Sequence, residues 1–333
     1  MPTSPANPAF DPRPSMRWVM LACVPGALVL CWQFGWGTLL QLLLGLATAL
    51  ACEALGRRVH GAGQWSLGDL TWLGDGSALV TATLLALALP PYAPWWLSVS
   101  AAAFAHVGGK ALFGGFGKNP FNPAMLGYAF ALLAFPAQMT QWPAPGEAHG
   151  LLAGLQHIFI GPVAVDGWSQ ATVLDSLKHN DRLTVDELFQ RNPAFSHWQA
   201  GWVNVAFLLG GLLLIQRKVI RWHTPAGVLG ALFAASLLCW NGSGSDSNGS
   251  PFFHLFSGAT MLGAFFIATE PVSGAGSDRA RLWFGIGVGL WLYVIRTWGN
   301  YADGMAFAVL GMNMLVPIIE RRALKPIAEV TND

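Results

Sequence analysis

Ten apolar segments separated by polar loops dominate this sequence and limit the folds that it can adopt. Each is close to the roughly 20 residues that an α-helix needs to cross a bilayer. The segments are expected at residues 16–33, 36–55, 76–90, 94–113, 124–141, 200–216, 224–240, 252–269, 281–296 and 304–319. Charged residues make up 11% of the chain, against about 25% in soluble globular domains. The sequence therefore predicts an all-α polytopic membrane protein with about ten transmembrane helices.

The ten segments fall into two groups of five, which suggests how the chain is divided. We expect a disordered tail at 1–15, a first membrane half at 16–141, a loop at 142–199, a second membrane half at 200–322 and a C-terminal tail at 323–333. Equal halves predict two inverted five-helix repeats, an arrangement that is common in transporters. In support, Asn119 and Asn122 precede the fifth segment much as Asn300 and Asp303 precede the tenth.

The basic residues predict the orientation of these spans. With a cytoplasmic N-terminus, 14 of the 18 Lys and Arg residues fall in cytoplasmic loops. The outer loops then hold Lys178, Arg182, Arg191 and Arg296. This asymmetry agrees with the positive-inside rule and places both termini in the cytoplasm and the 142–199 loop outside.

Composition also excludes several kinds of site. A formal net charge of +1 without a basic cluster argues against a nucleic-acid partner. The four cysteines lie inside apolar segments and form no CxxC pair, so neither a zinc site nor an iron–sulfur cluster is predicted. His106 lies within a span, and no other His or Glu stands at a spacing that would form a metal site with it. Such a histidine is typically packed and bonded to a backbone carbonyl.

Ionisable residues within or beside spans are functional candidates, because they are costly to bury in a bilayer. Asp75, Glu270 and Asp303 lie at span ends. For Asp75 and Asp303, a role as a helix cap accounts for an aspartate at that position as well as a functional role does. Glu270 follows its span, where the helix dipole disfavours an acid, so a cap explains it less well.

A segment rich in glycine, lysine and Asn-Pro, residues 108–124, joins the fourth and fifth spans. Proline after Asn119 and after Asn122 disfavours a continuous helix. Glycine permits close approach of the backbone to a ligand. We expect a broken, re-entrant segment that lines a site; the alternative is a tight cytoplasmic turn.

The 142–199 loop is the longest polar interruption and contains the main candidate for chemistry. Asp166, Ser169 and Thr172 recur at three-residue intervals, so a helix would bring them to one face. The Thr172 hydroxyl is a competent attachment point for a phosphoryl group; the alternative is one turn of an ordinary loop helix. Nearby, Thr184 and Glu187 have the spacing of a capping box, which predicts a helix start.

Four motifs together resemble a known family. They are Asp75-Gly-Ser-Ala, Gly117-Lys-Asn-Pro-Phe-Asn-Pro-Ala, Ala268-Thr-Glu-Pro-Val-Ser and Tyr301-Ala-Asp-Gly-Met-Ala-Phe-Ala-Val-Leu. The chain resembles, over nearly its whole length, the D subunits of Rnf (Rsx) electron-transport complexes, which are related to the B subunit of sodium-pumping NADH–quinone reductases. The resemblance implies a multi-pass protein of the bacterial inner membrane, with the 142–199 loop in the periplasm.

The resemblance also implies FMN esterified through its phosphate to a threonine by a flavin transferase. The transferase motif has the form Asp-x-x-Ser/Thr-Gly-Ala-Thr. Asp166 to Thr172 fits this form except that Gln170 replaces the glycine, whereas Ser257-Gly-Ala-Thr260 matches only the last four positions. Thr172 is preferred, because Thr260 lies in mid-span and His254 stands in place of the aspartate.

The implied complex is a translocase that moves electrons between NADH and ferredoxin, or another low-potential acceptor, coupled to Na⁺ or H⁺ movement. The expected partners are the A, B, C, E and G subunits, especially the flavin-bearing G subunit, together with the lipid bilayer. A noncovalent riboflavin is expected beside Asn119 and Asn122. The competing hypothesis is a flavin-free secondary transporter or channel for a small solute, which the same architecture would serve.

Overall fold

The computed structural model describes residues 12–59, 76–114, 117–144, 150–161, 171–180, 183–191 and 199–323. Within these ranges the secondary structure is helical and includes no β-strand, as the sequence predicts. The first half contains α1 (Arg13–Phe34), α2 (Trp36–Val59), α3 (Ser77–Ala88), α4 (Trp95–Val107) and α5 (Pro123–Ala134). The second half contains α11 (Gln199–Gln216), α12 (His223–Leu238), α13 (Pro251–Phe256), α14 (Thr260–Leu262), the π-helix η3 (Gly263–Ile267), α15 (Asp278–Trp298) and α16 (Met305–Ala323).

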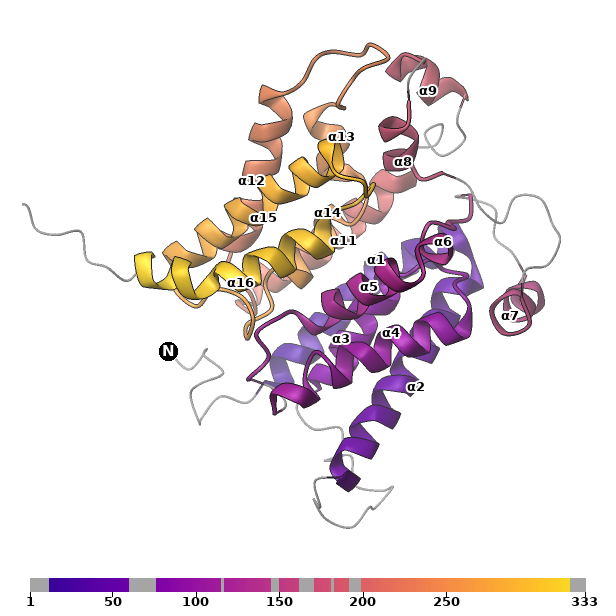
Figure 1. Cartoon of the computed structure of the whole chain (residues 1–333), viewed down its shortest axis with the longest axis vertical. Helices are drawn as coiled ribbons and strands as arrows, with labels where there is room; N and C mark the ends of the chain where they lie inside the picture. Colours follow the sequence, from indigo (N-terminus) through magenta and orange to yellow (C-terminus); the bar gives the residue numbers. More distant parts are fainter. Residues whose placement is uncertain are drawn as a thin grey trace, which may run out of the picture.

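The two halves form two bundles that lie side by side (Figure 1). Contacts α2–α4 and α4–α5 in the first bundle correspond to α12–α15 and α15–α16 in the second. Helices α1 and α11 form the main contact between the bundles, and α5 also contacts α16. These matched pairings are what two related halves would produce; the inverted repeat itself stays a prediction.

Shorter helices connect the halves and cover one end of the bundles. They are α6 (Pro136–Met139), α7 (Leu151–Phe159), α8 (Val173–Lys178) and α9 (Val185–Arg191), whereas the 3-10 helix η2 (Ala111–Phe113) joins α4 to α5 at the opposite end. The predicted capping box begins α9: the Thr184 hydroxyl accepts from the Glu187 N–H at 3.3 Å, and a Glu187 carboxylate oxygen accepts from the Thr184 N–H at 2.9 Å. These two bonds satisfy backbone donors at the helix start.

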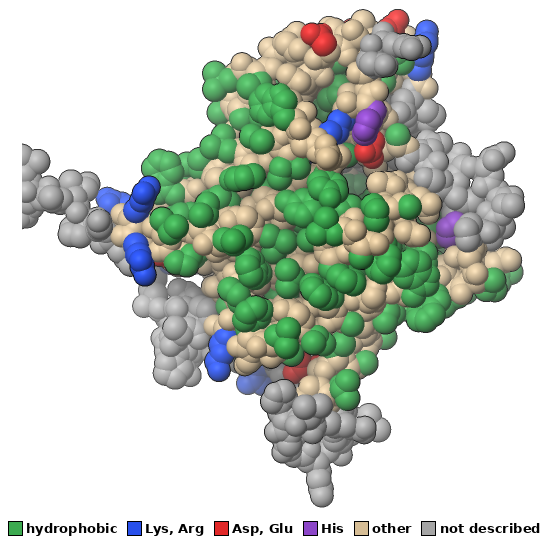
Figure 2. Space-filling view, viewed as in Figure 1, with side chains coloured by type: hydrophobic (Ala, Val, Ile, Leu, Met, Phe, Trp, Pro, Cys, Tyr) green, Lys and Arg blue, Asp and Glu red, His purple; other side chains and the backbone are tan. Residues whose placement is uncertain are grey.

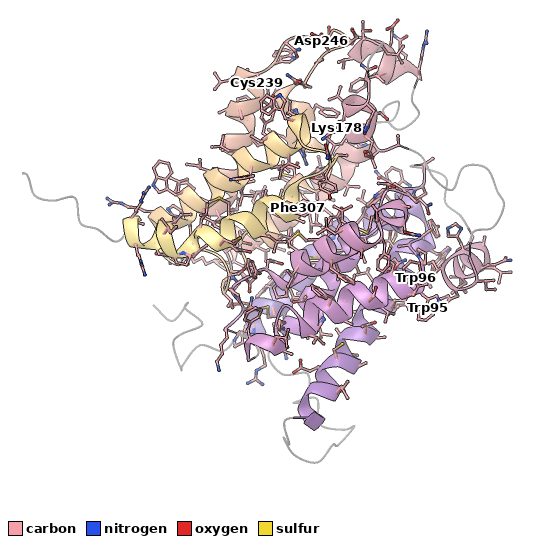
Figure 3. All side chains as sticks on the ribbon, viewed as in Figure 1. Trp95, Trp96, Lys178, Cys239, Asp246 and Phe307 are labelled. Carbon is pink, nitrogen blue, oxygen red and sulfur yellow. The ribbon has the colours of Figure 1, made fainter. Side chains whose placement is uncertain are left out.

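Loops that the sequence assigns to the outer face meet at one end of the bundles, which we call the Thr172 end. There the Tyr92 hydroxyl donates to the Phe34 carbonyl at 2.7 Å, and the Phe34 ring packs 5.9 Å from the Trp142 ring. At the opposite end Arg217 lies over the Trp18 ring. Figure 3 shows Asp246 at the top of the view and Trp95 and Trp96 at its right side, with Lys178 on α8 and Phe307 near the centre of the view.

The outer surface of the bundles is strongly apolar. Figure 2 shows hydrophobic side chains across the middle of one face, with most of the charged side chains towards its margins. Among the described residues, α1 and the Trp36–Gly56 part of α2 are long and apolar enough to cross a membrane, and four shorter apolar helices accompany them. All ten predicted segments overlap helix, but the number of membrane crossings stays a prediction.

Three predicted spans differ from the observed helices. The α-helix of the 94–113 segment ends at Val107, and a turn through Gly108 and Gly109 leads to the 3-10 helix η2; the backbone path there leaves no room for a Cβ at position 109, which would lie 2.3 Å from the Ala105 carbonyl oxygen. The 124–141 segment is interrupted after Ala134, where Phe135 leaves the helix before Pro136. The 252–269 segment is not one helix: it breaks at residues 257–259, where Gly258 has a φ of +58°.

Candidate functional site

A cavity of about 340 Å³ lies between the two halves. Residues of α1, α3 and α5 line it on one side, and residues of α11, η3 and α16 line it on the other. Its aromatic lining consists of Phe34, Tyr128, Trp142, Phe207 and Tyr301. The volume lies within the range of about 300–1,000 Å³ that is typical of small-molecule sites. The cavity is therefore large enough for an aromatic ligand.

Thr172 lines this cavity and is half-buried. It is the N-cap of α8, where its hydroxyl oxygen accepts from the Asp175 N–H at 3.2 Å. The same hydroxyl donates to Asp175 Oδ2 at 2.8 Å. The cap holds the hydroxyl at the start of a helix that faces the cavity, so Thr172 is both positioned and reachable.

Lys178 ties the Thr172 helix to the second bundle. Its Nζ donates to the carbonyls of Ile295 at 3.1 Å, Arg296 at 3.2 Å and Tyr301 at 2.7 Å. Two of these carbonyls lie in the last turn of α15, where a cation is favourable. Partial burial lowers the pKa of Lys178, and the charge of Asp175 opposes that shift. This clamp holds α8 over the end of α15.

Arg296 lies next to the cavity with 4% of its surface exposed. We call Arg296 and its hydrogen-bond partners Asp303, His254, Ser257 and Thr260 the Arg296 hub. Arg296 forms an ion pair with Asp303 at 3.2 Å and donates to the carbonyls of His254 at 2.8 Å and Ser257 at 3.2 Å. Arg296 was predicted to be an outer-loop residue, and that prediction was wrong. The hydropathy pattern locates the end of a span but not the long-range partners that bury a guanidinium.

Asp303 and Asn204 complete the polar support of the broken helix. Asp303 Oδ2 accepts from the Ala259 N–H at 2.7 Å, and the Asn204 amide donates to the carbonyls of Phe256 and Gly258, both at 3.0 Å. The break therefore leaves these backbone groups satisfied although they lie inside the bundle. Reasoning from the sequence did not identify Asn204 as a functional residue. The only indication in the sequence was a polar residue within an apolar segment.

Thr260, the alternative attachment residue, differs sharply from Thr172 in its surroundings. Its side chain is fully buried, and its hydroxyl lies 2.9 Å from the His254 carbonyl and 2.8 Å from the Ser257 carbonyl. It also accepts from Arg296 at 2.9 Å. The Thr260 hydroxyl is thus fully buried among partners from several elements, whereas Thr172 is half-buried, lines the cavity and bonds through its hydroxyl only to Asp175 of its own helix.

The opposite end of the bundles holds the Asn-Pro segment, which is broken as predicted. Asn122 is the N-cap of α5 and accepts from the Met125 N–H at 3.0 Å. Its side-chain amide donates to the Ile267 carbonyl at 3.0 Å, and its backbone N–H donates to Asn313 Oδ1 at 3.0 Å. Asn122 therefore joins the first half to the second.

Asn119 lies beside Glu270 in the same cluster. Its amide nitrogen contacts Glu270 Oε1 at 3.5 Å, and Glu270 Oε2 accepts from the Ser273 N–H at 2.7 Å. Among the described residues, the buried Asn119 Oδ1 has no hydrogen-bond partner. The cavity lining nearest this cluster includes Met125 and Ile267 but neither asparagine, so the structure does not bring Asn119 or Asn122 to Thr172.

The remaining candidates have simpler outcomes. Asp75, Asp166 and Ser169 lie outside the described residues. His106 is packed as predicted, with its ring nitrogens 2.8 Å from the Ala102 carbonyl and 3.2 Å from the Ala78 carbonyl. In the part of the chain that the structure describes, no group of His, Cys, Asp and Glu residues is arranged to hold a metal ion.

We expect Asn122→Ala to lower the free energy of unfolding by about 2–3 kcal/mol, because it removes a cap and leaves the buried Ile267 carbonyl unpaired. The matched control is Ser250→Ala, which removes the cap of α13. That change should cost about 1 kcal/mol. Unfolding of the detergent-solubilised chain on titration with SDS measures both, and equal losses would contradict a bridging role for Asn122.

Comparison with known proteins gives a consistent result over nearly the whole chain. The model of the NQR2, RnfD, RnfE family matches residues 7–327. A protein of Pseudomonas aeruginosa (strain LESB58), named as the D subunit of an ion-translocating oxidoreductase complex, is 59% identical, covering 96% of this chain and 92% of the relative. Proteins with the same name from Alcanivorax borkumensis and Cellvibrio japonicus are 47% and 45% identical, each covering 92% of this chain and 89% and 87% of the relative.

Proposed function

We propose that this chain, which belongs to the NQR2, RnfD, RnfE family, is the D subunit of an ion-translocating oxidoreductase complex. The family and the apolar helices indicate an integral membrane protein. In this proposal the complex passes electrons between NADH and ferredoxin, or another low-potential acceptor, and couples the transfer to Na⁺ or H⁺ movement. The bacterial inner membrane is the proposed location, with the Thr172 end in the periplasm.

Thr172 is the proposed attachment point for FMN, through a phosphoester formed by a flavin transferase. The observation that carries this proposal is the position of Thr172, which is half-buried and lines a cavity that has aromatic side chains, while the competing Thr260 is fully buried with its hydroxyl bonded to Arg296. Esterification would replace the hydroxyl proton, so the bond donated to Asp175 Oδ2 would be lost. The bond accepted from the Asp175 N–H can remain, which would preserve the start of α8.

The cavity residues fit a flavin in size and chemistry. Tyr128, Trp142 and Tyr301 offer aromatic surface, and the remaining lining is mainly apolar. These residues would hold the ring and exclude water, while Lys178 and the Thr172 cap keep the attachment point beside the cavity. When bound, the flavin supplies the electron transfer, and the protein supplies position and environment.

A noncovalent riboflavin beside Asn119 and Asn122 is the second part of the proposal. The buried, unpartnered Asn119 Oδ1 supports a ligand at this end, because buried polar atoms are normally satisfied. The proposed electron donor or acceptor at the Thr172 end is the flavin-bearing G subunit, within a complex that also contains the A, B, C and E subunits. A flavin-free secondary transporter is the competing proposal, since two matched halves around a cavity would also serve solute transport.

In-gel flavin fluorescence of the denatured chain tests the attachment. We expect Thr172→Val and Thr172→Asn to lose the fluorescence when the flavin transferase is present, and Thr260→Val to retain it. Asparagine is a good N-cap but forms no phosphoester, so Thr172→Asn separates loss of the ester from loss of the α8 cap. Fluorescence that persists in Thr172→Asn would contradict the assignment, and its absence from the native chain would favour the transporter.

A further inference from the structure

Helix α7 presents an apolar face away from the rest of the protein. Leu152 on the helix and Ile160 at its end are 79% and 81% exposed, and Leu151 and Phe159 are also exposed. Gln156 is the only polar side chain among the exposed residues of 151–160. A helix face that is exposed to water normally carries polar side chains. The apolar face of α7 is therefore suited to an apolar environment.

The opposite face of α7 is fixed against the bundle through Gly154. A Cβ at that position would lie 3.1 Å from Tyr92 Cε1 and 3.8 Å from Leu40 Cδ1, so a larger residue would push α7 away. The His157 ring also packs edge-on against the Tyr92 ring, with centroids 6.2 Å apart. These contacts set the height of α7 along the bundle at the level of Tyr92 and the first turns of α2.

Exposed tryptophans mark the same level. Trp36 begins α2, and Trp95 and Trp96 begin α4; all three are exposed. The Gln41 amide of α2 donates to the Ala93 carbonyl at 2.7 Å, which brings the start of α4 level with the first turns of α2. In the view of Figure 3, Trp95 and Trp96 lie on the same side of the first bundle as α7. Tryptophan is enriched where the hydrocarbon core meets the headgroups. The exposed Leu39 and Leu43 of α2 continue the apolar surface from this level along a helix that is long and apolar enough to cross a membrane.

We infer that α7 lies in the bilayer interface at the Thr172 end, with Leu151, Leu152, Phe159 and Ile160 inserted among the lipid acyl chains. The occupant is lipid, because the apolar face is level with the tryptophans and continuous with the apolar surface of α2. Residues 150–161 contain no Lys, Arg, Asp or Glu, so binding would not depend on charged headgroups. The inference uses the membrane location alone and is independent of the flavin.

This anchor would act on the segment that carries Thr172. Only residues 160–172 separate the end of α7 from the start of α8. With α7 held at the bilayer and α8 clamped by Lys178, both ends of that connection are restrained. The consequence is that Thr172 stays close to the membrane surface.

Fluorophores on single cysteines test the inference in the full chain, reconstituted in phosphatidylethanolamine and phosphatidylglycerol vesicles. The labelled variants are Leu152→Cys and Ile160→Cys, with Gln190→Cys on the exposed side of α9 as the control, after replacing the four native cysteines by Ala. We expect lipids with brominated acyl chains to quench residues 152 and 160 several-fold more than residue 190. Aqueous iodide should show the reverse order.

Two results would overturn the inference. Iodide quenching of residue 152 both in the isolated chain and in the assembled complex would show that the face is in water. Iodide access in the isolated chain that disappears in the complex would assign the face to a partner protein. If the cysteine-free chain does not insert, a benzophenone amino acid at residue 152 of the otherwise native chain replaces the label; a lipid adduct supports the inference, and a protein adduct overturns it.

Discussion

Replacing Arg296 with Met should lower the free energy of unfolding by about 3–5 kcal/mol, because it removes one partner of a buried ion pair. The remaining Asp303 carboxylate would lose its cation, and the carbonyls of His254 and Ser257 would lose their guanidinium donor and be left to share the single Thr260 hydroxyl. The Ser257 carbonyl lies at the break between α13 and α14, and His254 lies in the last turn of α13 before it. We therefore expect the effect to be concentrated in the second bundle.

Arg281→Met is the matched control for this prediction. Its ion pair with Asp278, at 2.9 Å, joins side chains that are 24% and 51% exposed, so its loss should cost about 1 kcal/mol or less. Thermal unfolding of both variants in detergent provides the comparison. The double variant Arg296→Met with Asp303→Asn should lose less than the sum of the two single changes, because the uncompensated charge is gone. Equal losses in Arg296→Met and Arg281→Met would show that the hub does not hold the broken helix.

The second large effect is functional. We expect Thr172→Asn to reduce the ion uptake that accompanies electron transfer from reduced ferredoxin to NAD⁺, in vesicles containing the complex, to the level of vesicles without it, because the electron path would lack its attached flavin. The cap of α8 should survive, since asparagine can accept from the Asp175 N–H. The complex should therefore still assemble, and co-purification of its subunits measures this separately from activity.

The same variant distinguishes the two proposed functions. A flavin-free transporter has no use for an esterified threonine, so its solute flux would be unchanged in Thr172→Asn. Gln190→Glu, a change on the exposed face of α9 away from the cavity lining, is the control for general damage to this end of the molecule. Full ion uptake by Thr172→Asn vesicles that lack flavin fluorescence would contradict the redox proposal.

Hydropathy was sufficient to predict the helices but not where they break. The ten apolar segments and the Asn-Pro turn were predictable, because local propensity and proline determine them. The interruption at 257–259 was not, because Ser257-Gly258 is compatible with a packed helix until Arg296 and Asp303 supply other partners for its backbone. Those partners are about 40 residues away in sequence and leave no periodic signal.

The candidate site was predictable only in part, for a similar reason. Thr172 stood out because it lies in the one long polar loop and because of the resemblance to a flavin-attachment motif. The cavity beside it is built from single residues of many helices, such as Tyr128 of α5 and Phe207 of α11, and no contiguous stretch of sequence encodes it. Arg296 and Asn204 were missed because a polar residue in an apolar segment does not reveal its depth or its partners.

Intact mass of the native chain, made together with an active flavin transferase, tests the central claim most directly. We predict an increase equal to one FMN less one water, and fragmentation should place it on the peptide that contains Thr172. A modified Thr260 would mean that the attachment site is the buried hub and that its threonine is exposed during maturation. An unmodified native chain would contradict the claim that this protein carries a covalent flavin.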